Sequence, residues 1–466
     1  MMNGSPKEAR IARLCKRMPG LLLATAFGLS ACSLAPRYEM PEQPVPAQWE
    51  GAETAADAEP PAPEWWRRYG SAELDALMER ALEGNHDLAA AVARIEQARA
   101  GFRVARSALW PFLGASAGVS RDRTRNGETV TSEDSRAGVS ADYTVDLWGA
   151  NRNAADIAAL RLAVTEHDRD AILLALQTDV AAGYFQLLAL ADRTRIAERN
   201  LEAARELLRL IEVRFDNGAA TALDLAQQRT VLLNIEAQLP VLRQATVETR
   251  RALAVLAGLP PGSLELRGGT IADLALPAID PGIPAEALLR RPDIRAAEAA
   301  LIAANADIGI ARAALFPDLG VSASAFVRDV AGSGSVTAAS IAASLAQTLF
   351  DGGARRGRIE LSQAARQELA ENYAQAVLVA LTDVENALTA VATSQRRVEI
   401  LTETVAQARE AYRLSRVRFD AGAIDLLTVL DSQRTLLSAE DSLVQAKQAR
   451  LDASAVLVRA LGGGTS

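Results

Sequence analysis

The chain is poor in the residues that build disulfides, metal centres and catalytic sites. Its 466 residues include two cysteines and two histidines, His86 and His167. So few ligands, with no cysteine cluster, leave little for a transition-metal site. The sequence shows no nucleophile elbow, no glycine-rich phosphate loop and no catalytic triad. We therefore predict a protein that is not an enzyme and that needs neither a cofactor nor a metal.

The first 31 residues have the features of a lipoprotein signal peptide. An apolar run from Gly20 to Gly28 is too short to cross a bilayer, and Leu29-Ser30-Ala31 places small residues directly before Cys32. This pattern is typical of a lipobox, so we predict that Cys32 receives a diacylglycerol and an N-acyl chain. The alternative is an ordinary signal peptide followed by an incidental cysteine. The positive residues before the apolar run are Lys7, Arg10, Arg13, Lys16 and Arg17.

Charge and hydropathy exclude further classes. Removing the leader takes away five positive charges and one negative charge, which changes the formal net charge from −8 to −12. A chain this acidic is a poor candidate for binding nucleic acid. Cys15 leaves with the leader, so Cys32 has no cysteine partner within the mature chain. No later stretch reaches eighteen uninterrupted apolar residues, which argues against a transmembrane helix.

Residues 32–70 predict an extended arm rather than a helix or a strand. The segment is rich in proline, alanine and glutamate, and its apolar residues follow neither the helical period nor the strand period. It ends near the pair Trp65-Trp66. We expect this pair to dock the arm on the body of the protein. A position near the membrane interface is the alternative.

Helical periodicity dominates the rest of the chain. Apolar residues recur three and four apart over 71–82, the helical pattern continues over about 86–109, and Trp110-Pro111 ends it. From about Asn151 one apolar stripe continues for about 64 residues, which corresponds to a helix of roughly 95 Å. Proline is absent from that stretch and Gly183 is its only glycine. Such length favours coiled-coil packing.

Two segments with period two interrupt the helices in each half of the chain. In 136–147, Val139, Ala141 and Tyr143 alternate with polar residues, and 111–122 precedes it across a polar loop, 123–135. The second half has similar runs at about 318–328 and 337–349. Each pair predicts a β-hairpin.

The chain contains an internal duplication. RFDNGA at 214–219 returns as RFDAGA at 418–423, and Leu109-Trp110-Pro111 returns as Leu315-Phe316-Pro317. The offset stays at 204–206, so each half repeats one unit of helix, hairpin, very long helix, tight corner and returning helix. Gly218 and Gly422 suit the left-handed caps of the two corners.

The four strands are about 10–12 residues long with one apolar face, which is typical of transmembrane β-strands. Open edges are not tolerated in lipid, and four strands cannot enclose a lumen, whereas twelve strands from three chains can. A soluble four-stranded sheet that caps a helical bundle is the alternative. The expected fold class is mainly α with membrane β.

These patterns divide the chain into five parts. They are a signal peptide, 1–31; an acylated arm, 32–70; a first repeat, 71–260, with hairpin 111–147 and tip 214–222; a linker, 261–291; and a second repeat, 292–463, with hairpin 318–349 and tip 418–426.

Over about 64–463 the chain resembles the TolC-like outer membrane factor family. The segment Trp65-Trp66-Arg67-Arg68-Tyr69-Gly70, the phrase Leu289-Arg290-Arg291-Pro292-Asp293 and the stretch Thr428-Val429-Leu430-Asp431 carry the resemblance. The phrase between the halves is similar to that of the lipidated branch that serves resistance-nodulation-division (RND) pumps. The resemblance implies a homotrimer with a twelve-stranded β-barrel in the outer membrane and an α-helical tunnel in the periplasm, in which 261–291 belongs to an equatorial belt.

The resemblance also implies a gate at the periplasmic tips. Asp431 matches an acidic position of the family's constriction, Leu427 is a candidate for an adjacent apolar ring, and Thr428 stands where some members carry another acid. Three converging carboxylates repel each other and raise their pKa values, so Arg416, Arg418 or apolar contact would have to hold the gate closed. Contact with an adaptor is expected at Arg214, Gly218, Arg418 and Gly422.

The implied function is passive export of small molecules, such as drugs and toxic compounds, from an inner-membrane RND-type transporter and a periplasmic membrane fusion adaptor. Partners from a major-facilitator pump or a one-step (type I) protein exporter are the alternative, and a non-channel coiled-coil lipoprotein scaffold is a more distant one. The cargo and the identity of the pump are not readable from the sequence.

Overall fold

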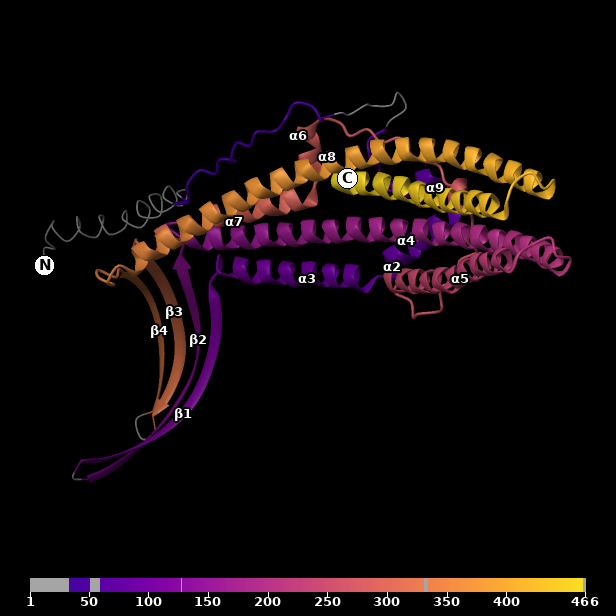
Figure 1. The fold of residues 1–466 in the computed structure, drawn as a ribbon. Helices are drawn as coiled ribbons and strands as arrows, with labels where there is room; N and C mark the ends of the chain where they lie inside the picture. Colours follow the sequence, from indigo (N-terminus) through magenta and orange to yellow (C-terminus); the bar gives the residue numbers. More distant parts are fainter. Residues whose placement is uncertain (1–32, 51–58, 127, 331–333, 464–466) are drawn as a thin grey trace, which may run out of the picture. The chain divides into compact units, whose positions relative to one another are not determined.

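The computed structural model of the chain describes residues 33–50, 59–126, 128–330 and 334–463. The chain forms two compact units, which are described separately below (Figure 1). The first unit comprises Met1–Glu42, Arg94–Glu166 and Ala296–Ala374. The second unit comprises Gln43–Ala93, His167–Arg295 and Gln375–Ser466. Cys32 and the signal peptide lie outside the described residues.

The first unit contains one curved, antiparallel, four-stranded sheet in the order β1-β2-β3-β4 (Figure 1). Its strands are β1 (Phe112–Asn126), β2 (Glu128–Val145), β3 (Asp318–Val330) and β4 (Gly334–Ala346). The predicted polar loop 123–135 is wrong, because β1 and β2 pair without a break from Phe112↔Asp142 to Asn126↔Glu128. Polarity suggested a loop, but the alternation of charged and β-branched residues in this region also suits a solvated extension of a hairpin.

The strand register brings the alternating apolar residues onto one face. Val139 lies opposite Ala115 on β1 and Ala325 on β3, and Ala325 lies opposite Ala339 on β4. Directly paired residues share a face of a sheet. That face therefore carries valine, leucine, isoleucine and alanine across all four strands. Several of these side chains are exposed, including Ile341 at 84% and Leu345 at 68%.

Aromatic side chains join the two repeats where the strands meet the helices. The Trp148 indole stacks on the Phe316 ring with the centroids 4.6 Å apart, and its Nε1–H donates to the Pro317 carbonyl at 2.8 Å. This stacking places the end of β2, from the first repeat, beside the start of β3, from the second repeat.

The arm that follows Cys32 lies along the helices of the first unit. The Ser33 hydroxyl donates to the Asn153 side chain at 3.0 Å. The Asn305 amide donates to the Pro36 carbonyl at 2.7 Å. Gly309 makes room for the arm, because a Cβ built there would lie 2.8 Å from the Ala35 nitrogen. Ser33 is thus held against α4 (Ala150–Asp216), and the residues that follow it lie against α7 (Pro292–Ala313).

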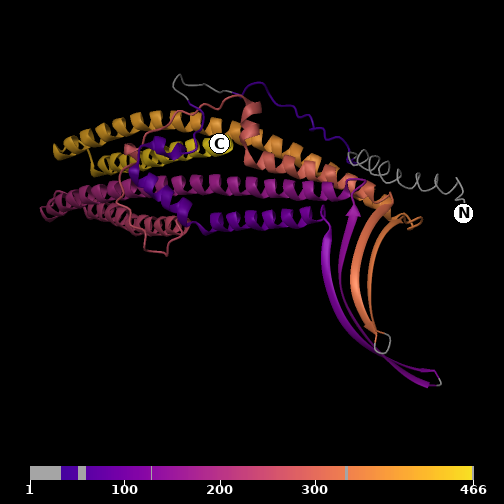
Figure 2. The ribbon, with the colours of Figure 1, turned by 180° about the vertical axis from the view of Figure 1, so that it is seen from behind.

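The second unit consists of two antiparallel helix pairs (Figures 1 and 2). The long helices α4 and α8 (Ala354–Asp420) begin in the first unit and continue into the second, where α5 (Ala222–Leu256) and α9 (Leu426–Ala460) return beside them. Both long helices have 67 residues, so the expected very long hairpins are confirmed. The remaining elements are α2 (Ala72–Gly84), α3 (His86–Ser107), α6 (Pro284–Arg290) and the short 3-10 helices Trp65–Tyr69 and Ile271–Asp273.

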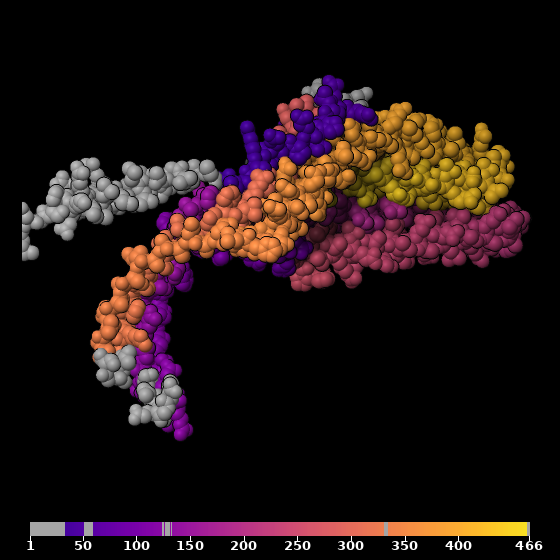
Figure 3. Space-filling model, turned by 90° about the vertical axis from the view of Figure 1, so that its left-hand side faces the viewer, coloured from indigo at the N-terminus to yellow at the C-terminus, as the bar shows by residue number. Residues whose placement is uncertain are grey.

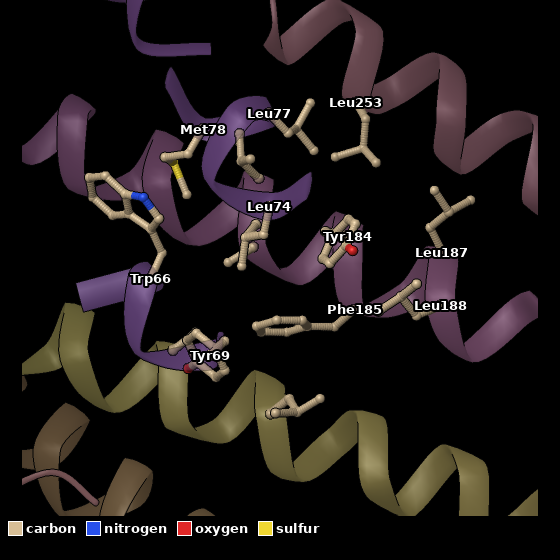
Figure 4. Packing of buried hydrophobic residues seen from close by; sticks show 14 of the residues in the cluster. Trp66, Tyr69, Leu74, Leu77, Met78, Tyr184, Phe185, Leu187, Leu188 and Leu253 are labelled. Carbon is tan, nitrogen blue, oxygen red and sulfur yellow. The ribbon is translucent and has the colours of Figure 1, made fainter. Parts of the chain in front are cut away.

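The paired tryptophans lie in the core of the second unit, and Trp66 is labelled there in Figure 4. Trp65 and Trp66 are 2% and 3% exposed, and the Trp65 indole donates to Gln177 at 3.2 Å. Tyr69 packs on Phe185 with the ring centroids 4.9 Å apart and shares a hydrogen bond of 2.6 Å with Ser454. The expected docking of the arm on the body is confirmed. These rings tie the N-terminal segment to α4 and to the far end of the chain on α9.

Equivalent polar side chains cap the two returning helices. The Asn85 amide donates to the Leu256 carbonyl at 3.0 Å, and the Arg291 guanidinium donates to the Ala460 carbonyl at 2.9 Å. Arg291 also pairs with Asp293 at 2.7 Å and with Asp383 at 3.0 Å. Burial opposes ionisation of Asp293, but the bonds from Arg291 prevail and lower its pKa. The Arg-Arg-Pro-Asp phrase therefore closes the end of the second helical hairpin.

Among the described residues, two helices, α4 and α8, contain a stretch long and apolar enough to cross a membrane by length and composition alone. In α4, 56% of that stretch is buried inside the chain, as expected for a core helix. In α8 the buried share is 28%, so an apolar face of α8 is left uncovered by its own chain.

Gly183, the only glycine of α4, marks a close approach between helices. A Cβ built on it would lie 2.7 Å from the Leu253 Cδ2 atom on α5. We expect Gly183→Ile to overpack this contact and to lower the free energy of unfolding by about 1–3 kcal/mol. Thermal unfolding of the purified protein measures the change.

Leu253→Ala provides the matched control for that variant. It opens space at the same contact, so combining it with Gly183→Ile is expected to recover part of the lost stability. If the two losses simply add, the packing explanation is contradicted.

Candidate functional site

The repeated phrase builds the same corner at the tips of both helical hairpins. Gly218 and Gly422 have φ values of 74° and 71°, in the left-handed region that glycine adopts most readily. Gly218 N–H donates to the Phe215 carbonyl, and Gly422 N–H to the Phe419 carbonyl, both at 2.9 Å. These glycines end α4 and α8 and let the chain reverse.

The returning helices begin with side-chain caps that involve one of the predicted gate residues. Thr221 and Asp224 form a capping box at the start of α5. At the start of α9, the Asp425 carboxylate accepts from the Thr428 N–H at 3.0 Å and from the Thr428 hydroxyl at 2.6 Å. These bonds lower the pKa of Asp425. The Thr428 hydroxyl is therefore engaged within its own chain.

Asp431 and Leu427 lie on an uncovered face of α9. They stand four residues apart, and Arg434 follows three residues later, so the three side chains form one stripe. Leu427 is 56% exposed, and the Asp431 carboxylate pairs with Arg434 at 2.9 Å. Within the described residues, neither Arg416 nor Arg418 pairs with Asp431, and Arg416 donates to the Tyr412 hydroxyl at 3.5 Å. Their expected part in holding three copies of the gate closed stays a prediction.

The opposite face of α9 packs the two tips together. The space-filling view shows the two helical hairpins lying against each other (Figure 3). Phe419 of the second corner contacts the first hairpin, and the guanidinium carbon of Arg214 lies 4.4 Å from the centre of its ring. A cation over an aromatic face is attractive. Arg214, expected to contact an adaptor, is thus committed to the second tip. The buried cluster at the tips comprises Leu207, Ile211, Phe419, Leu426, Val429 and Leu430.

Two glutamines are buried at the tips, and their burial was not predicted from the sequence. The Gln228 side chain is fully buried and donates to the Ala204 carbonyl at 2.7 Å. Gln433 is 1% exposed, and among the described residues neither atom of its amide has a hydrogen-bond partner. Their repeated Gln-Arg-Thr setting at 228–230 and 433–435 was the available signal, but a repeat alone does not distinguish buried from exposed positions.

The chemistry of the tips suits an obstruction rather than catalysis. The stripe on α9 offers one carboxylate, one guanidinium and one large apolar side chain, and the caps of the returning helices use Thr221, Asp224, Asp425 and Thr428. Within the described residues, no group of three or more histidine, cysteine, aspartate or glutamate side chains is arranged to hold a metal ion.

Comparison with known proteins identifies relatives over nearly the whole chain. The outer membrane efflux protein family matches residues 77–259 and again 283–463, which is one match for each repeat. The pyoverdine export outer membrane protein OpmQ of Pseudomonas aeruginosa is 39% identical over 95% of this chain and 96% of its own. The solvent efflux pump outer membrane protein SrpC of Pseudomonas putida is 31% identical over 94% of this chain and 96% of its own.

A solved structure shows the same fold. The outer-membrane channel OprN superposes with a TM-score of 0.85 at 30% identity, and the match covers 93% of this chain and 99% of OprN.

The placement of Asp431 generates a test of the tips. We expect Asp431→Ala, alone or with Thr428→Ala, to raise ion conductance in planar bilayers severalfold, because it removes the pair of Asp431 with Arg434 from the exposed stripe and with it a contact that favours the closed tips. Glu236→Ala on α5 is the matched control, since Glu236 is also an exposed acid paired with an arginine, Arg205. Unchanged conductance in the Asp431 variants would remove this residue from the gate.

Proposed function

The chain belongs to the outer membrane efflux protein family, and from this premise we propose that three copies form a gated export tunnel. As a member of this family, the protein is an outer-membrane efflux channel, the exit component of an efflux pump. In the proposed trimer, twelve strands close a barrel, the helical hairpins continue it as a tunnel, and their tips form the periplasmic gate.

The unpaired edges of the sheet carry the proposal. Within the described residues, β1 pairs with β2 alone and β4 with β3 alone, so each outer strand has a row of unpaired backbone groups. Unpaired groups cost several kcal/mol each in hydrocarbon, and closure is the way a membrane sheet removes its edges. Pairing β4 of one copy with β1 of the next satisfies both edges and leaves none when the ring closes.

Strand length and face chemistry agree with a membrane barrel. The 13 residues of β3 extend about 43 Å, which spans roughly 30 Å of hydrocarbon at a tilt of about 45°. The apolar face would meet lipid, and the serine- and glycine-rich face would line the lumen. The uncovered apolar face of α8 supports further contact between copies.

Three-fold symmetry would turn the stripe on α9 into rings. We place Leu427 and Asp431 at the constriction, where three copies of each side chain converge. Repulsion between carboxylates disfavours closure, while the Arg434 pairs and the leucine ring favour it. Opening then requires a partner that binds the open tips more tightly than the closed ones.

We propose a periplasmic membrane fusion adaptor at the tips, contacting the corners at Gly218 and Gly422, and an RND-type transporter behind it. The printed names of the relatives refer to pyoverdine in one case and to solvent in another. Those cargoes differ while the fold is shared, which supports a passive tunnel whose selectivity resides in the pump.

Lipidation of Cys32 completes the proposal. Ser33 is held against α4, so acyl chains on the neighbouring cysteine would lie close to the helices that lead into the sheet. We expect Cys32→Ser to abolish incorporation of labelled palmitate while the strands still insert. Labelling that survives this change would show that the lipobox reading is wrong.

Complementation tests the choice of partners. In a strain without its own outer-membrane efflux channels, the chain is co-expressed with an adaptor–pump pair of the RND type, of the major-facilitator type or of the one-step exporter type. We expect export of a fluorescent pump substrate to be restored with the RND pair. Restoration only with one of the other pairs contradicts the RND assignment but leaves the channel function intact.

A further inference from the structure

The two hairpin tips have the same backbone but unequal side-chain surroundings. Phe419 is 5% exposed and lies under the guanidinium of Arg214, whereas Phe215, its counterpart in the first repeat, is 39% exposed. Arg418, the counterpart of Arg214, is exposed. In the part of the chain that the structure describes, its side chain has no hydrogen bond, ion pair or ring contact. One arginine–phenylalanine pair is therefore formed, and the components of a second remain apart.

The junctions beside the sheet show the same inequality in the other unit. Trp148 of the first repeat stacks on Phe316 of the second. The repeat equates Trp110 with Phe316, and the step Leu147-Trp148 matches the step Leu349-Phe350 at a shorter offset of 202, so Trp148 corresponds to Phe350. Trp110 is 69% exposed and Phe350 is 88% exposed, and within the described residues neither ring contacts another aromatic ring. Again one pair is formed and its counterpart is left open.

A ring of repeats explains both observations. In each formed pair, a residue near the end of one element in the first repeat contacts the second repeat. By the same rule, the equivalent residue of the second repeat, Arg418 or Phe350, contacts a first repeat that follows it. A single chain has no first repeat in that position. In a closed ring of copies, the first repeat of the neighbouring copy lies there.

We propose that Arg418 of one copy lies over the ring of Phe215 of the next copy, repeating between chains the contact of Arg214 with Phe419. The proposal rests on the proposed trimer and specifies which residues hold its tips together. By the same argument, Phe350 of one copy contacts Trp110 of the next copy. Both contacts run from the second repeat of one copy to the first repeat of its neighbour.

The contact between the tips of neighbouring copies is weaker than the contact between the two tips of one chain; we call each of these contacts a seam. Within the chain, Leu207 and Ile211 of α4 pack against Phe419. Their counterparts on α8, counted from the repeated phenylalanine, are Ala411 and Ser415, which offer much less apolar area. The cation–π contact is thus a larger share of the attraction between copies than within a chain, and the tips separate first at this seam.

Cross-linking tests the contact with an internal calibration. In trimers verified by light scattering, the double variant Arg214→Cys/Phe419→Cys identifies the shortest bismaleimide linker that joins its two thiols within one chain. The same linker is then applied to Arg418→Cys/Phe215→Cys. We expect covalent dimers and trimers on a denaturing gel, whereas the calibration pair stays at monomer size and its linkage is read by mass.

The outcomes distinguish failure of the Arg418–Phe215 contact from failure of the proposed trimer. Each of the four single cysteine variants should give no covalent dimer, which controls for Cys32. A trimer in which the calibration pair reacts but Arg418→Cys/Phe215→Cys stays monomeric overturns this contact and leaves the proposed function standing. Failure of both double-cysteine variants and of the unmodified chain to form trimers overturns the trimer itself.

Conductance distinguishes stacking from simple packing. Phe215→Tyr keeps an aromatic face for Arg418, whereas Phe215→Leu keeps apolar volume and loses the face. We expect the leucine variant to raise baseline conductance severalfold and the tyrosine variant to leave it near the unmodified level. Equal behaviour of the two variants would contradict a cation–π contact at this seam.

Discussion

The structure depends on the unpaired backbone groups along the outer edges of β1 and β4. In water, side chains and solvent can protect such edges, but in hydrocarbon each unpaired group is costly, so the sheet is stable only when another strand meets each edge. In hydrocarbon, a single chain therefore lacks partner strands for the outer edges of β1 and β4. The requirement accounts for the exposed apolar residues of the sheet and of α8, which would be a liability in a monomer.

The internal duplication builds the chain from two similar units with little new sequence. The same phrase gives the same corner twice, and the same strand-end aromatics occur twice, but each copy of the phrase meets a different neighbour. Phe419 packs with Leu207 and Ile211 and lies under Arg214, whereas Phe215 is 39% exposed. A repeat that is symmetric in backbone thus becomes asymmetric in packing, and the difference leaves uncovered surfaces that the proposed trimer assigns to neighbouring copies and to the gate.

Much of this architecture was predictable because its signals are periodic and local. The 67-residue helices, the four alternating strands and the glycine corners follow from patterns within each segment. The loop predicted over 123–135 failed because polarity indicates a loop and a solvated hairpin equally. At the tips, exposure of Leu427 and Asp431 follows from helical phase, but the pairing of Asp431 with Arg434 and the burial of Gln433 depend on rotamers and neighbours that no sequence pattern specifies.

The most direct test of the account is the mass of the detergent-purified mature protein by light scattering, with single-channel conductance measured on the same sample. The account predicts a trimer that inserts and conducts poorly until the tips are altered. A monomer that does not conduct, and that is soluble once its lipid is removed, would contradict it. The four strands would then form a closed local sheet, and a coiled-coil scaffold would explain the long helices better.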